Sequence, residues 1–342
     1  MPRLSGPLAE GPIDIHAHVV MPEIYERTSA HSVFTRPPEG VEMTPQMQAQ
    51  AAARAQSVVD AMADMDARPA HMDAMGVGVQ VLSVSLVHQC TYFASAQASL
   101  AMEQRANDRL AAMALRDPAR FRALGGAPLH APHLAARELR RVVEELGFIG
   151  VGVSTMAADM EIGDQRLWDF WAEAESLDAL VYIHPAGNHD PRFRKHFLWN
   201  SVGQSFEEAM AIASLMYEGV LERFPRLRIC VSHGGGYMPY YLGRIERNYI
   251  EKPTTRKNMR RSPTEYLRGL WYDSCVYDPR ALRVLADVVG VERIVLGTDY
   301  PVGDRQPRAF IEQAGFEPAQ VEAILRGNAL SMLGWDGQPR AP

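Results

Sequence analysis

Residues 12–19 read PIDIHAHV, a short apolar run that carries two histidines one residue apart. Seven further runs rich in Val, Ile and Leu follow it, and stretches with helical patterning of roughly 12 to 25 residues lie between them. These runs occupy residues 78–86, 122–129, 148–154, 180–184, 227–233, 269–274 and 293–299. Several are continuously apolar, as parallel strands covered on both faces are. Eight strand–helix units in 342 residues predict an α/β protein with a (β/α)₈ TIM barrel fold.

The connections between the predicted strands differ in length. Amphipathic patterns predict helices over the following residues: 134–146, 166–177, 205–224 (ending before Pro225) and 280–289. Two connections are longer, residues 21–75 after strand one and 186–202 after strand five. Long connections in a compact domain are usually caps or lids, although plain helix packing also explains the Met- and Ala-rich part of the first. We expect residues 1–342 to form one barrel domain, with residues 21–75 as a helical insertion or cap and a loop insertion after strand five.

The composition excludes several classes of protein. Hydrophobic residues make up 47% of the chain and charged residues 22%, which is typical of a globular protein and not of a disordered one. The net charge is −6, so the chain lacks the positive electrostatic field that is typical of proteins that bind nucleic acids or membrane surfaces. No apolar run reaches the length of a membrane span. Cys90, Cys230 and Cys275 are odd in number and form no CxxC pair, which supports neither a disulfide framework nor a zinc site made of cysteines. A small-molecule partner, and neither nucleic acid nor membrane, is therefore predicted, together with a cytoplasmic location.

Metal-competent side chains fall at the carboxyl ends of the predicted strands, where the active sites of TIM barrels form. His16 and His18 lie near the end of strand one, and residues two apart on a strand point to the same side. His184, His233 and Asp299 end strands five, six and eight. One histidine at a strand end is usually structural, but five such residues at one rim predict a metal site. Imidazole and carboxylate ligands suit Zn²⁺, with Mn²⁺ as the alternative.

One divalent metal per subunit is expected. Two-metal barrels of this kind commonly need a carboxylated lysine as a bridge, and none of the lysines of this chain lies in a predicted strand. With one metal, the nearest four groups can be its ligands, namely His16, His18, His184 and Asp299. His233 is then available as a general base toward water bound to that metal.

Longer motifs carry a resemblance to a known family. IDIHAHV at 13–19, YIHPAG at 182–187, VSHGGGYMPYYLGRIER at 231–247 and VERIVLGTDYP at 291–301 resemble the amidohydrolase-related metal-dependent decarboxylases. Within them the chain resembles the branch typified by 2-amino-3-carboxymuconate 6-semialdehyde decarboxylase. The resemblance implies metal ligation by His16, His18, His184 and Asp299, with His233 as acid and base. It also implies a homodimer in which Arg244 reaches across the interface toward a substrate carboxylate, for which a guanidinium fork is suited.

The chain also departs from the family pattern. The family has a second substrate arginine in the first long insertion, and neither Arg54 nor Arg68 aligns with it. Arg192 and Arg194, on the loop after strand five, are candidates for substrate binding in its place. The alternative interpretation is that Arg192 and Arg194 are exposed loop charges and that Arg244 forms an ordinary ion pair on its helix.

The resemblance implies a carbon–carbon lyase that needs no organic cofactor. Its expected reaction is metal-dependent, non-oxidative decarboxylation of an aromatic or unsaturated carboxylic acid. Metal-bound water and His233 would deliver the proton to carbon, and Asp299 would hold the metal and bond that water. The rival hypothesis is hydrolysis of an amide, lactone or C–C bond by the same metal hydroxide. A metal-binding scaffold without activity is the third.

Overall fold

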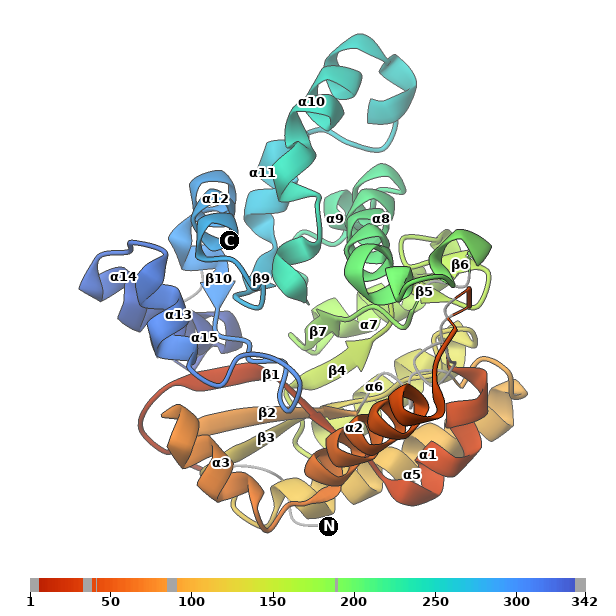
Figure 1. The fold of residues 1–342 in the computed structure, drawn as a ribbon. Coiled ribbons are helices and arrows are strands. Elements are labelled where there is room, and N and C mark those ends of the chain that lie inside the picture. Colours follow the sequence, from red (N-terminus) through yellow and green to blue (C-terminus); the bar gives the residue numbers. More distant parts are fainter. Residues whose placement is uncertain (1–5, 33–38, 41, 85–90, 188–189, 336–342) are drawn as a thin grey trace.

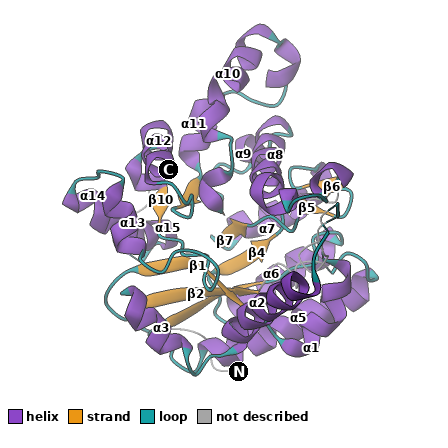
Figure 2. Cartoon of the chain, in the orientation of Figure 1, coloured by secondary structure: helices purple, strands orange, loops and turns teal. Residues whose placement is uncertain are grey.

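The computed structural model describes residues 6–32, 39–40, 42–84, 91–187 and 190–335. Its centre is one sheet of eight parallel strands with helices on the outside (Figure 1, Figure 2). The order in the sheet is the order in the chain: β1 (Ile13–Val19), β2 (Val79–Val84), β3 (Phe121–Gly125), β4 (Gly150–Val153), β7 (Leu180–Ile183), β8 (Arg228–Val231), β9 (Trp271–Asp273) and β10 (Ile294–Val295). The predicted barrel is confirmed, and each strand overlaps its predicted range. Residues 85–86 of the second predicted strand, and Cys90, lie outside the described residues.

The barrel closes where β1 meets β10 and the residues that follow it, a junction that we call the seam. One isolated parallel bridge joins Ala17 to Tyr300. Backbone hydrogen bonds run from Ile15 N to Leu296 O at 3.0 Å and from His18 N to Tyr300 O at 2.9 Å. In the described residues these contacts take the place of a regular ladder, so side chains contribute to holding the seam together.

A β-bulge in β1 decides which way its histidines face. Ile15 belongs to the apolar cluster inside the barrel, whereas Ala17 belongs to the cluster between the sheet and the helices. The pairing with β2 slips by one residue between Asp14 and Ala17. Such a slip turns the side chains that follow to the other face of the strand. His16 and His18 consequently face the barrel interior, and Asp14 faces outward.

Helices cover the outer face of the sheet. The predicted helices 134–146, 166–177 and 280–289 are observed as α6 (Pro132–Glu144), α7 (Trp168–Ser176) and α12 (Pro279–Val289). Further helices are α5 (Ala96–Ala114), α11 (Pro263–Gly269), α13 (Pro307–Gln313), α14 (Pro318–Glu322) and α15 (Asn328–Leu333).

The prediction of one continuous helix over residues 205–224 is wrong. The segment is divided into α8 (Gln204–Tyr217) and α9 (Val220–Arg223). Gly219 lies between them with φ of 82°, a left-handed conformation that ends α8 and that glycine adopts without a steric penalty.

The first long insertion is helical, as predicted. It contains α1 (Pro22–Thr28), α2 (Pro45–Ala63) and α3 (Arg68–Met75). The backbone of Val20, directly after β1, bonds the carbonyl of Met62 at 3.4 Å, which joins the end of α2 to the barrel.

The later insertions add short elements. The loop after β7 holds single turns at Pro191–Phe193 and Trp199–Gly203, and a small antiparallel hairpin pairs β5 (Met156–Ala157) with β6 (Met160–Glu161). Helix α10 (Leu242–Glu251) projects away from the barrel (Figure 1). Within the described residues, no helix combines the length and apolar character that a membrane crossing requires.

Candidate metal and acid–base site

Five side chains predicted from the sequence converge at the carboxyl ends of the strands. His16 and His18 come from β1, His184 follows β7, His233 follows β8 and Asp299 follows β10. One ligand atom from each of His16, His18, His184 and Asp299 lies within 4.8 Å of the others, and all four residues are buried. His233 lies beside them, with its Nε2 3.9 Å from Asp299 Oδ2.

The ring nitrogens of the three buried histidines are arranged as metal ligands are. His16 donates from Nδ1 to Asp273 Oδ2 at 2.6 Å, and His184 donates from Nδ1 to the carbonyl of Pro185 at 2.9 Å. Because a neutral imidazole carries one N–H, both Nε2 atoms then present lone pairs to the cluster. Nε2 of His184 is buried without a partner among the described residues, and Nε2 of His16 lies 3.1 Å from Nε2 of His18. Buried acceptors that face one another fit a bound cation.

Asp299 supplies negative charge to the cluster. Its Oδ1 lies 3.2 Å from His16 Nε2 and 3.1 Å from His18 Nε2. Burial raises the pKa of Asp299, but the facing histidines outweigh burial and lower this pKa well below its ordinary value. Burial lowers the pKa of His16, yet Asp299 and Asp273 raise it to about 9. The two carboxylates therefore favour a positive charge at this point, either a proton or a metal ion.

His233 pairs with Glu208, which the sequence analysis missed. His233 donates from Nδ1 to Glu208 Oε1 at 2.5 Å, and the Ser232 hydroxyl donates to the same oxygen at 2.7 Å. Glu208 is fully buried on α8, and burial raises its pKa. Burial opposes a charge on His233, but Glu208 and Asp299 raise the pKa of His233 well above its ordinary value. With Nδ1 bonded to Glu208, Nε2 is the His233 atom that faces the cluster and can exchange a proton with a bound molecule.

Asp273 and Tyr277 support the cluster and were also missed. Asp273, at the end of β9, accepts from His16 Nδ1 and from the Tyr182 hydroxyl at 2.8 Å. Tyr277 donates from its hydroxyl to Asp299 Oδ2 at 3.0 Å. Asp273 carries the same sequence signal as the predicted ligands, a polar residue at the end of an apolar run. Glu208 carries no such signal, because it lies within a helix.

The three arginines predicted for substrate binding do not enter the cluster. Arg192 pairs with Asp190, two residues away, and Arg194 Nη1 lies 3.7 Å from Glu39 Oε1. Arg244 is exposed on the projecting helix α10. Among the described residues, no hydrogen bond or ion pair joins these guanidinium groups to the clustered residues. That Arg244 acts on a partner subunit stays a prediction.

A hollow of about 300 Å³ adjoins the cluster, and its lining includes Cys275, Tyr277, Val302 and Phe310. Cys275 Sγ lies within 4.8 Å of ring nitrogens of His16 and His233, which places this hollow beside the clustered histidines. Its volume lies at the lower end of the range for small-molecule sites.

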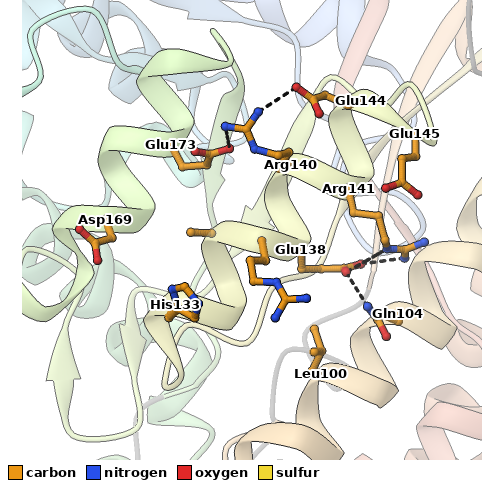
Figure 3. A pocket seen from close by; sticks show the side chains of 12 residues that line it. Leu100, Gln104, His133, Glu138, Arg140, Arg141, Glu144, Glu145, Asp169 and Glu173 are labelled. Carbon is orange, nitrogen blue, oxygen red and sulfur yellow. Dashed lines mark hydrogen bonds and ion pairs between the residues drawn. The ribbon is translucent and has the colours of Figure 1, made fainter.

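A larger groove of about 480 Å³ lies elsewhere, on the outer helices α5, α6 and α7 (Figure 3). Several of its charged residues pair with one another, such as Arg140 with Glu173 at 2.7 Å and Arg141 with Glu138 at 2.8 Å. The described histidine cluster is not part of it.

A barrel of parallel strands with imidazole and carboxylate groups gathered at its carboxyl ends defines the class of metal-dependent barrel enzymes. The family model described as amidohydrolase matches residues 13–335. The chain belongs to this amidohydrolase family, which confirms the resemblance drawn from the motifs.

Its relatives include named decarboxylases. The chain is 35% identical over 280 residues to 2-amino-3-carboxymuconate-6-semialdehyde decarboxylase of Dictyostelium discoideum, covering 80% of this chain and 77% of the relative. It is 30% identical over 285 residues to gamma-resorcylate decarboxylase of Polaromonas sp. (strain JS666), covering 78% and 86%. A crystal structure of dihydroxybenzoic acid decarboxylase from Polaromonas sp. JS666, with bound manganese and the inhibitor 2-nitroresorcinol, shares the fold at a TM-score of 0.81 and 24% identity, covering 97% of this chain and 98% of that one.

Proposed function

We propose that this chain is a metal-dependent, non-oxidative decarboxylase of an aromatic or unsaturated carboxylic acid. The observation that carries the proposal is the convergence of one ring nitrogen from each of three imidazoles with the Asp299 carboxylate, next to the His233–Glu208 pair. The two decarboxylases to which the chain is similar support the reaction class.

One divalent cation per subunit would be held by His16, His18, His184 and Asp299. When bound, it supplies positive charge that stabilises the negative charge developing on the substrate as the C–C bond breaks. The donor set suits both Zn²⁺ and Mn²⁺. The manganese in the Polaromonas decarboxylase structure supports Mn²⁺ as a resident ion.

His233 provides the proton that replaces the carboxylate. As the C–C bond breaks, CO₂ leaves and the electron pair of that bond stays on the substrate carbon. His233 Nε2 gives a proton to this carbon, while Glu208 bonds Nδ1 and stabilises the positive charge on the ring before the transfer. Solvent then returns a proton to His233. The reaction consumes no water and needs no organic cofactor.

The test is detection of CO₂ from purified protein loaded with Mn²⁺ or Zn²⁺, across hydroxylated benzoates and carboxymuconate-type acids. We expect CO₂ from at least one acid of these classes, together with a product that carries one solvent hydrogen on carbon. Hydrolysis, the rival reaction, would instead place ¹⁸O from labelled water in an acid product. Incorporation of ¹⁸O without release of CO₂ would overturn the proposal.

We further propose a homodimer in which Arg244 reaches the substrate of the partner subunit. Arg244 is exposed, and the large apolar side chains of Tyr241 and Ile250 in the same segment are 59% and 67% exposed, which supports an interface here. Mixing inactive His233→Ala and Arg244→Ala proteins should restore partial activity, because a hybrid dimer holds one complete site. No recovery under conditions where subunits exchange would contradict this role.

The domain organisation and the cellular location are also part of the proposal. Residues 1–342 form one barrel domain with residues 21–75 as a cap. The protein is cytoplasmic, for which the unpaired thiols of Cys230 and Cys275 are the support.

A further inference from the structure

Arg68, the first residue of α3, is a fully buried arginine that contacts both sides of the seam. Its Nη2 donates to the carbonyl of His18 at 2.7 Å, and its Nη1 donates to Gln80 Oε1 at 3.3 Å. Its guanidinium lies over the ring of Tyr300, 4.5 Å from the ring centroid. His18 is a clustered residue on β1, and Tyr300 directly follows the clustered residue Asp299. Arg68 therefore touches the two segments that bring these groups together.

Asp14 makes a second bridge across the seam. This buried carboxylate accepts through Oδ2 from Gln80 Nε2 at 3.0 Å and from the Thr298 hydroxyl at 2.7 Å. Its Oδ1 accepts from the backbone N–H groups of Thr298 at 2.9 Å and His16 at 3.1 Å. One path of hydrogen bonds thus runs from Arg68 through Gln80 to Asp14, and on to the backbone beside the clustered groups.

The environment of Arg68 indicates that its position matters. Its contacts are the carbonyls of His18 and Met62, the amide of Gln80 and the ring of Tyr300. Burying a guanidinium whose direct contacts are neutral is costly compared with an apolar side chain of similar length, and the nearby charges of Asp14 and Asp64 offset only part of that cost. The planar fork of arginine, however, donates in several fixed directions at once, which an apolar side chain cannot do.

We infer that Arg68 is a positioning residue that fixes the separation of His18 and Asp299 across the seam and so sets the affinity of the cluster for its cation. Gln80 and Asp14 are its partners in this role. The inference rests on the proposed function in one respect, since the cluster must bind a divalent cation. It also assigns a task to the insertion 21–75, which contributes Arg68 to the support of the site.

The experiment measures the dissociation constants of Mn²⁺ and Co²⁺ for wild type, Arg68→Met and Gln80→Leu by competition with a chelator. The visible absorption of bound Co²⁺ reports ligand geometry, and thermal unfolding of the metal-free proteins reports stability. We expect Arg68→Met to weaken binding by about 10-fold or more, as is typical when a group that orients metal ligands is lost. Gln80→Leu should act in the same direction with a smaller effect, and both should change the Co²⁺ spectrum.

Arg120→Met is the matched control. Arg120 also donates to backbone carbonyls, those of Val77 and Gly78 at 3.0 and 3.2 Å, but at the start of β2 and away from the cluster. It should lower stability and leave metal affinity and the Co²⁺ spectrum unchanged. If Arg68→Met and Gln80→Leu lose stability yet bind metal as tightly as wild type, the inference is overturned. If wild type itself binds neither ion, the proposed metal-dependent function also fails. Metal binding by wild type therefore distinguishes failure of the inference about Arg68 from failure of the proposed function.

Discussion

Two buried polar clusters of this protein differ in how their groups are satisfied. Between α5, β3 and α6, Glu138 accepts from Asn107 Nδ2 at 2.7 Å. It also accepts from Arg141 Nε at 2.9 Å and from Gln104 Nε2 at 3.2 Å, and Figure 3 shows these two partners. Asn107 also bonds the N–H and the carbonyl of Gly126. Each of these acceptors faces a donor. At the carboxyl ends of the strands, imidazole lone pairs and a carboxylate face one another instead.

The difference separates a structural role from a chemical one. A polar network with matched donors and acceptors fixes packing and requires nothing further. A cluster of unmatched acceptors favours a positive charge among its members, either a proton or a bound cation. The groove in Figure 3 and a hollow of about 670 Å³ lined in part by Arg122 and Trp335 are both larger than the hollow beside the histidines. Volume alone would therefore not select the histidine cluster as the candidate site. The pattern of donors and acceptors distinguishes the candidate site, whereas cavity volume does not.

Asp299→Ala should have the largest effect, because it tests whether the histidine cluster binds metal, which the matched cluster should not do. It removes the carboxylate that lies against His16 and His18, so we expect the metal to be lost on dialysis against a chelator and decarboxylation to fall below detection. Elemental analysis and CO₂ release are the measurements. Asp278→Ala, which removes an exposed carboxylate paired with Arg280, is the control and should keep the metal. Full metal occupancy in dialysed Asp299→Ala would refute the assignment.

His233→Ala should have the next largest effect, and it distinguishes the acid–base residue from the metal ligands within the cluster. We expect bound metal to be retained and kcat to fall by about 10³-fold, the middle of the range for loss of a positioned acid or base. Metal content and turnover are measured on the same preparation. Loss of the metal ion would instead make His233 a ligand.

Glu103 lies on α5 next to Gln104 of the matched cluster, and its substitution has the smallest expected effect. It is buried and accepts from the Thr91 hydroxyl at 3.0 Å. Burial raises its pKa from 4.5 to about 8. Between these pH values the folded chain holds a proton that the unfolded chain has released, so the stability present below pH 4.5 is lost as the pH rises toward 8.

Glu103→Gln cannot ionise and should not show this loss. Relative to the variant, wild type should lose on the order of 3 kcal/mol of unfolding free energy between pH 5 and pH 8. Urea unfolding across this range is the measurement, and metal content should equal that of wild type. Parallel pH profiles for the two proteins would show that Glu103 is ionised in the folded state.

Much of the fold was predictable because each strand is a short apolar run that shows its own pattern. The break at Gly219 was not, because the helical pattern continues across it. The clustered histidines and Asp299 were predictable because this fold brings the ends of its strands to one rim. Asp273 also lies at the carboxyl end of a strand and was overlooked. Glu208 was not predictable in this way, because it lies within a helix and its position there does not reveal that it bonds His233.

The sequence by itself determined the succession of strands and helices and the polar residues that follow the strands, because these patterns are local. Only the tertiary structure decided that a bulge turns His16 and His18 inward, that Arg68 reaches the seam, and which imidazole nitrogen faces the cluster. These outcomes depend on partners remote in the chain. His16 is oriented by Asp273, 257 residues away, and no local pattern carries the direction of such a hydrogen bond.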